Sequence, residues 1–315
     1  MAVAGVVGVA LIATVSWFAI RSDVVPFLAS DQCTAEVGDR TVALDLTQAR
    51  YAGLITAIAV ERGMPARAAS IALAAAYQES DLHNLRGGDR DSAGLFQQRP
   101  SQGWGTLAEV RDPVHATNAF YDALAKVDGY EQLEITVAAQ EVQRSAFPDA
   151  YADHEADARA LASALSGNSP EGFSCRLHED ADDAGTGLEG SGLTARAELV
   201  RRDLLARFPG LPLGGFEPGG VSTGHMEGSA HYDGRAIDAF VRPVSAANRT
   251  RGWAIAQYLV SQADRLAITT VIFDDRIWTA GTRSGDGWRD YDAPERSGDP
   301  AVLEHRDHVH VDVHA

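Results

Sequence analysis

Two histidine-containing segments, one near residue 230 and one at the end of the chain, constrain this sequence more than any other feature. The first reads Ser229-Ala-His231-Tyr-Asp-Gly234-Arg-Ala236-Ile-Asp238, and the second reads Asp307-His308-Val309-His310. A His and an Asp seven residues apart, with a second His supplied from far along the chain, are the parts of an open three-ligand zinc site. Structural zinc is usually closed by four ligands and rich in Cys, so the pattern favours catalytic zinc. The alternative is two solvated histidine segments without a metal.

The two segments resemble the motifs of the LAS zinc metallopeptidases, the D-alanyl-D-alanine carboxypeptidase and Hedgehog-like group. These carry Ser-x-His-x-x-Gly-x-Ala-x-Asp followed by a late His-x-His or Asp/Glu-x-x-His, and both halves match here. The resemblance implies an α+β zinc-peptidase-like domain over residues 193–315, with Zn²⁺ bound by His231, Asp238 and His310. It also implies that Asp307 is the general base and that His308 is the first His of the His-x-His form.

The alternation of residues 308–313 tests these roles. Polar and apolar residues alternate, which predicts a half-buried strand with His308 and His310 on its open face. Asp307 has the wrong parity to share that face unless the chain bends where the strand begins. Glu304 and His308 are therefore alternative bases.

A second candidate site lies in the first half of the chain, at the end of a predicted helix over residues 66–78. This helix is apolar almost all round, and Glu79 follows it directly. Poor solvation and the partial negative charge of the helix C-terminus should both raise the pKa of Glu79, so that it could donate a proton. The alternative is an ordinary polar residue at the edge of a helix.

Glu79-Ser80, followed by Gly94-Leu95-Phe96-Gln97, resembles the lysozyme-like domains of lytic transglycosylases and goose-type lysozymes. The segment from Gly87 to Thr106 resembles a group of actinobacterial cell-envelope proteins of this type. The resemblance implies an all-α domain over residues 41–176, with Glu79 as the general acid and Gln97 in the glycan cleft. Phe96 replaces the usual Met, and the later Ala-Tyr-Asn motif is missing. Trp104, between two glycines, could stack on a sugar ring or could simply fix its loop.

The two cysteines of the chain, Cys33 and Cys175, bracket this predicted helical domain. In an oxidising compartment they would most simply pair, and closing so long a loop would contribute about 4 kcal/mol. The alternative is two unpaired buried thiols. A Cys33–Cys175 disulfide would place the helical domain outside the cytoplasm.

The start of the chain predicts attachment to a membrane. Residues 2–20 carry no charge and are just long enough to cross a bilayer as a helix. We expect residues 1–21 to be a transmembrane anchor or a signal, residues 22–40 a tether, and the acidic, glycine-rich residues 177–192 a flexible linker. The protein would then be a single-pass protein of the cell membrane with both domains extracytoplasmic, or secreted if the first segment is cleaved.

The net charge limits the possible partners, and together with the motifs it leads to an expected fold class and function. A net charge of −17 leaves no basic stripe for phosphates and excludes a nucleic-acid partner. The expected fold class is multidomain, an all-α lysozyme-like domain followed by an α+β zinc-peptidase-like domain, after an N-terminal transmembrane helix. The expected function is envelope-anchored peptidoglycan hydrolysis, in which a zinc peptidase cuts stem peptides or cross-links and the lysozyme-like domain binds or cleaves glycan, as a lytic transglycosylase or a muramidase. The alternative is a non-catalytic cell-wall-binding scaffold with degenerate sites.

Overall fold

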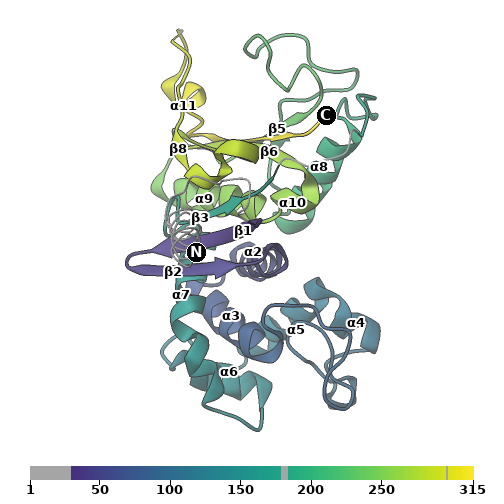
Figure 1. The fold of residues 1–315 in the computed structure, drawn as a ribbon, viewed down its shortest axis with the longest axis vertical. Coiled ribbons are helices and arrows are strands. Elements are labelled where there is room, and N and C mark those ends of the chain that lie inside the picture. Colours follow the sequence, from purple (N-terminus) through teal and green to yellow (C-terminus); the bar gives the residue numbers. More distant parts are fainter. Residues whose placement is uncertain (1–29, 179–183, 296) are drawn as a thin grey trace, which may run out of the picture. The chain divides into compact units, whose positions relative to one another are not determined.

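A computed structural model describes residues 30–178, 184–295 and 297–315 (Figure 1). Of these, Gln32–Ala315 form one compact unit. The segment expected to cross the membrane, residues 1–21, lies outside the described residues, as do residues 22–29 of the expected tether. Among the helices that are described, none is both long enough and apolar enough to span a bilayer.

The first part of the unit is built around α3 (Ala66–Ser80), a helix of mostly small residues that is buried along most of its length. Small side chains allow neighbouring helices to pack closely against it on several sides. These neighbours include α2 (Leu46–Glu61), α5 (Pro113–Leu124), α6 (Ile135–Gln143) and α7 (Glu155–Leu165), and the short α4 (Leu107–Arg111) precedes α5. Two 3-10 turns, η2 (Pro100–Gln102) and η3 (Ala150–His154), complete this part.

The same part of the structure also contains a three-stranded antiparallel sheet. Its strands are β1 (Gln32–Val37), β2 (Arg40–Leu44) and β3 (Phe173–Arg176), in the order β2-β1-β3. Cys33 and Cys175 lie directly opposite each other on β1 and β3 and form a disulfide. The predicted disulfide is therefore confirmed, whereas part of the segment expected to be a tether forms β1.

The second part of the unit is a six-stranded antiparallel sheet with helices on one face. In sheet order its strands are β4 (Leu213–Gly214), β5 (Ala236–Phe240), β9 (His308–Val313), β6 (Ile268–Phe273), β7 (Arg276–Thr279) and β8 (Arg289–Asp290). Val309 and Val311 of β9 face inward and pack with the buried side of α9 (Ala246–Ser261). The remaining elements are α8 (Ala195–Arg207), α10 (Ala263–Leu266), η4 (Gly281–Asp286) and α11 (Pro300–Leu303).

The two parts share a buried interface. Gly53 of α2 faces Ser261 of α9 so closely that a Cβ atom at residue 53 would lie 2.1 Å from the Ser261 hydroxyl oxygen. Farther along the interface, the indole N–H of Trp288 donates to the backbone carbonyl of Phe173 on β3 at 2.8 Å. Apolar residues of both parts belong to a single buried cluster. Close packing of this kind couples the two parts mechanically.

The expected fold class is therefore wrong. The described chain is a mixed α/β structure with two antiparallel sheets rather than an all-α lysozyme-like domain followed by a separate α+β domain. The reason is the pairing of β1 with β3, which brings two short segments from opposite ends of the helical region into one sheet. Periodicity within a short window carries no information on such a long-range pairing.

Candidate functional site

Strands β5 and β9 bring the predicted metal ligands together. Asp238 on β5 lies directly opposite His310 on β9, and residues paired in this way project from the same face of a sheet. This is the face opposite the valines that pack on α9. His231 comes from the turn that precedes β5, where Gly234, with a φ of 66°, reverses the chain. The three residues are only 2% to 8% exposed.

The three ligand atoms form a nearly equilateral triangle. His231 Nε2 lies 3.1 Å from His310 Nδ1, His310 Nδ1 lies 3.0 Å from Asp238 Oδ1, and His231 Nε2 lies 3.2 Å from Asp238 Oδ1. Ligands about 2.0–2.1 Å from a tetrahedral zinc ion are separated from one another by about 3.3 Å. The two nitrogens and the oxygen therefore fit a zinc ion with only a small expansion.

Both imidazoles are held from behind by acceptors that fix their orientation. His231 Nδ1 donates to the carbonyl of Gly215 at 2.7 Å, and His310 Nε2 donates to Asp312 at 2.8 Å. Partners of this kind leave the lone pair of the other ring nitrogen directed at the metal position. Gly215 has a φ of 80°, and a Cβ atom there would lie 2.3 Å from the His231 ring, so a side chain at this position would displace the ligand.

The electrostatics of the triangle favour a cation. Burial alone would raise the pKa of Asp238, but hydrogen bonds from His231 and His310 hold that pKa far below its usual range. Burial alone would lower the pKa of His310, but Asp312 and Asp238 raise it to about 10. In the metal-free protein His310 is therefore a cation between two carboxylates. A bound metal ion would replace its proton as the source of positive charge.

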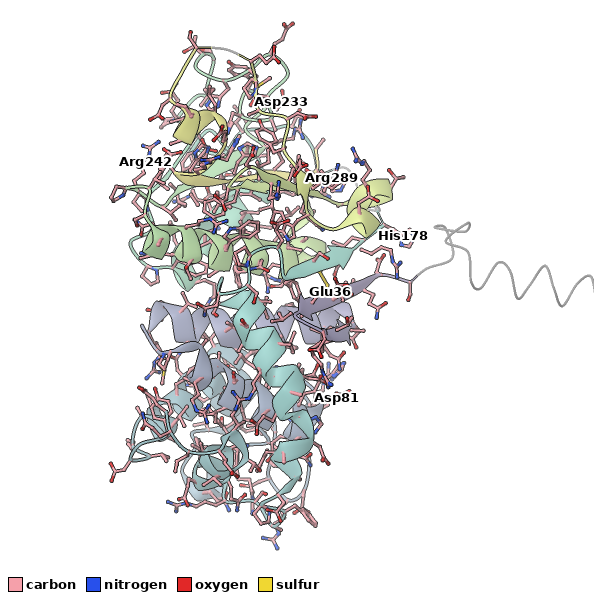
Figure 2. The ribbon with its side chains drawn as sticks, turned by 90° about the vertical axis from the view of Figure 1, so that its left-hand side faces the viewer. Glu36, Asp81, His178, Asp233, Arg242 and Arg289 are labelled. Carbon is pink, nitrogen blue, oxygen red and sulfur yellow. A yellow bond between two sulfur atoms is a disulfide. The ribbon has the colours of Figure 1, made fainter. Side chains whose placement is uncertain are left out.

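Asp307 and His308 form a dyad next to the triangle. His308 Nδ1 donates to Asp307 Oδ1 at 2.6 Å, and Arg242 Nε donates to Asp307 Oδ2 at 2.6 Å; Arg242 is labelled in Figure 2. Both oxygens of Asp307 are thus engaged with neighbouring side chains. His308 Nε2 is 3.7 Å from Asp238 Oδ1, so it faces the metal position. This arrangement favours His308 over Asp307 as the group that handles protons. Glu304, the third alternative, pairs with Arg306 at 2.8 Å.

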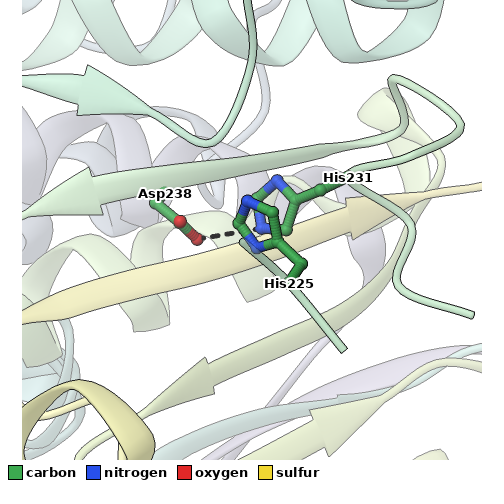
Figure 3. Close-up of side chains that lie close together, drawn as sticks. All are labelled: His225, His231 and Asp238. Carbon is green, nitrogen blue, oxygen red and sulfur yellow. Dashed lines mark ion pairs between the residues drawn. The ribbon is translucent and has the colours of Figure 1, made fainter. Parts of the chain in front are cut away.

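Two further histidines reach the site although neither belongs to the motifs. The ring of His225 stacks on that of His231, with centroids 3.9 Å apart, and ligand atoms of His225, His231 and Asp238 all lie within 4.8 Å of one another (Figure 3). The His305 ring lies 4.6 Å from that of His308, and its Nδ1 is buried without a hydrogen-bond partner. His225 is a lone His in a glycine-rich loop, and the sequence gave no signal that could have identified its contact with His231.

Glu79 lies in the last turn of α3, half-buried, as the sequence predicts. The hydroxyl of Tyr151 donates to Glu79 Oε1 at 2.7 Å. Burial raises the pKa of Glu79, and this effect outweighs the hydrogen bonds from Tyr151 and Gln143, which lower it. The carboxyl group is therefore easier to protonate than an exposed glutamate, which is the property required of a general acid.

A cavity of about 820 Å³ lies near this glutamate, which does not itself line it. Trp104 lines it, and so does Gln143, which hydrogen-bonds to Glu79. Gln97 is not part of its lining, and the Gln97 amide is engaged within its own turn. Its Oε1 accepts from the Ser92 hydroxyl at 3.1 Å, and its Nε2 donates to the Gly94 carbonyl at 3.0 Å. The structure thus places Trp104, but not Gln97, on the wall of this cavity.

Part of the chain matches a known protein family. The family described as "VldE, C-terminal domain" matches residues 189–301, which is less than half of the chain. The matched segment contains His225, His231 and Asp238 but ends before the dyad and His310. No curated protein matches the chain.

Proposed function

We propose that this protein is a zinc-dependent hydrolase that cleaves an amide bond in the peptide part of peptidoglycan. The observation that carries the proposal is the triangle of His231, Asp238 and His310, with edges of 3.0 to 3.2 Å. An arrangement of two imidazoles and one carboxylate, each supported from behind, is typical of catalytic rather than structural zinc. Zinc bound there would supply a water of lowered pKa and would polarise the carbonyl of the substrate.

The residues around the triangle can provide the remaining chemistry. His308 Nε2 faces the metal position, where it can accept a proton from the attacking water and later donate that proton to the leaving amine. Asp307 holds His308 through Nδ1 and stabilises the imidazolium that forms while the proton is carried. Arg242 fixes the second oxygen of Asp307, so the carboxylate keeps its orientation during turnover.

The choice of peptidoglycan rests on the resemblance of the two metal motifs to those of the LAS peptidases. The neighbourhood of Glu79 supports the same substrate. We propose as a second activity that the 820 Å³ cavity binds glycan, with Trp104 stacking on a sugar ring and Glu79 as the acid. A glutamate with a raised pKa, joined by a hydrogen bond to a residue that lines this cavity, is the observation that favours this second role. A wall-binding protein that cleaves neither glycan nor peptide is the alternative.

Product analysis tests both activities together. Zinc-loaded protein is incubated with purified peptidoglycan, and soluble products are identified by mass spectrometry. The peptidase proposal predicts new peptide ends that disappear in His231→Ala and after chelation of zinc. The glycan proposal predicts anhydro or reducing sugar ends that disappear in Glu79→Gln. Peptide release that persists unchanged in His231→Ala would refute the first, and the absence of new sugar ends from the wild type would leave the second site as a binding site.

A further inference from the structure

We propose that His225 is a fourth, displaceable ligand of the metal centre, so that the substrate-free protein holds its zinc in a closed site. The inference rests on the proposed function, because it assumes that His231, Asp238 and His310 bind the ion. It goes beyond that function by assigning a residue that neither metal motif contains.

The first observation is that His225 lies close to His231 and Asp238. Its ligand atom lies within 4.8 Å of the ligand atoms of His231 and Asp238, and its ring covers that of His231 (Figure 3). A tetrahedral site requires about 3.3 Å between ligand atoms, so His225 would have to move by up to about 1.5 Å toward His231 and Asp238, and come equally close to His310, to take the fourth position. The other three positions are already filled by the triangle.

The second observation is that His225 is half-buried within an otherwise exposed loop. Between Ser222 and Gly228 every residue is exposed except His225, which is half-buried. The backbone of His225 is fixed by Tyr232, whose hydroxyl accepts from the His225 N–H at 3.0 Å and donates to the His225 carbonyl at 2.7 Å. Since Tyr232 follows His231 directly, this clamp joins the loop to one of the metal ligands. The clamp holds the His225 backbone where its ring stacks on that of His231.

The third observation is that the loop around His225 is rich in glycine and has no regular secondary structure. Gly219, Gly220, Gly224 and Gly228 all have positive φ, and residues 215–230 contain no helix or strand. Segments with few buried apolar contacts open at a low cost in free energy. Because catalytic zinc requires one position open to substrate, this loop would have to release His225 before the reaction begins. The closed form would therefore protect the site in the absence of substrate.

His308 is the competing candidate for the fourth position, because its Nε2 lies 3.7 Å from Asp238 Oδ1. Its Nδ1 is held by Asp307, and its backbone belongs to β9, so it cannot leave the site without disturbing the sheet. His225 lies on a loop and can be displaced. Separate substitutions of the two histidines distinguish these roles.

The test uses zinc affinity, measured by competition with a chelator, and the absorption spectrum of the Co²⁺-loaded full-length protein. His225→Ala should raise the Kd for zinc by at least about tenfold, since even the loss of a group behind a ligand costs about 10- to 100-fold. It should also change the Co²⁺ spectrum, and added imidazole should restore the wild-type spectrum by filling the vacated position. Met226→Ala is the matched control, because Met226 is the exposed neighbour in the same loop. This variant should change neither quantity.

Tyr232→Phe is a second variant, which keeps the His225 imidazole but removes both hydrogen bonds to the His225 backbone. It should give a Co²⁺ spectrum intermediate between wild type and His225→Ala, and imidazole should shift it to the wild-type form. Equal zinc affinity and identical Co²⁺ spectra for wild type and His225→Ala would overturn the fourth-ligand proposal while leaving the zinc site intact. Failure of the wild type to bind zinc, or binding unaffected by His231→Ala, would overturn the proposed function as well.

Discussion

The division of roles between Asp307 and His308 can be tested by a double-mutant cycle. In the proposed mechanism His308 is the proton carrier and Asp307 is its positioning residue, and a buried hydrogen bond of 2.6 Å joins the two. Removal of the carrier in His308→Ala should lower kcat/KM by about 10²- to 10⁴-fold. A charge-assisted hydrogen bond contributes about 1.5–3 kcal/mol, so Asp307→Asn alone should lower kcat/KM by about 10- to 150-fold.

The decisive quantity is the effect of Asp307→Asn when His308 is already absent. If Asp307 acts through His308, the double variant should be no slower than His308→Ala alone. The assay is hydrolysis of a peptidoglycan-derived peptide by zinc-loaded protein, with zinc content measured in every variant and expected to stay near that of wild type. A further loss of about 10²-fold or more in the double variant, at full zinc content, would refute this assignment and make Asp307 the base.

Three further predictions concern stability, pH and the second site. Replacing Cys33 and Cys175 with Ser opens a loop closed across 142 residues, which should lower the free energy of unfolding by up to about 5 kcal/mol in denaturant titrations; an unchanged unfolding midpoint would contradict this. Burial lowers the pKa of His310, but Asp312 and Asp238 outweigh this effect and raise the pKa to about 10. Zinc must therefore displace a proton from His310, and zinc affinity should rise about tenfold per pH unit below pH 10. An affinity that does not depend on pH, measured by competition, would count against His310 as a ligand. Glu79→Gln should abolish release of sugar ends while leaving glycan binding and the thermal unfolding midpoint unchanged, because the amide keeps the shape but cannot donate the proton.

The grouping of His231, Asp238 and His310 was easier to predict from the sequence than the fold. The spacing of His231 and Asp238 and the alternation in residues 308–313 are local patterns, and local patterns predict which face of a strand a side chain occupies. The same alternation raised the objection to Asp307, and the structure shows that carboxylate engaged by Arg242 and His308.

The rest of the architecture depends on contacts between segments distant in the sequence. The β1–β3 pairing joins strands separated by most of the helical region, and the closest approach of α2 to α9 depends on a single residue without a side chain, Gly53. His225 reaches the site only because a loop without periodicity folds back over His231. None of these contacts leaves a pattern in its own neighbourhood, so propensity and spacing could not predict them.

The metal content of the purified protein tests the central claim most directly. Zinc is quantified after equilibration with a slight excess of the ion and removal of the unbound metal, in wild type, in His231→Ala, Asp238→Ala and His310→Ala, and in the control His83→Ala, whose imidazole pairs with Asp45 in the other part of the chain. We predict about one zinc per chain in the wild type and the control, and a loss of tightly bound zinc in each of the three ligand variants. A wild type without bound zinc, or a His231→Ala variant with full zinc content, would contradict the account.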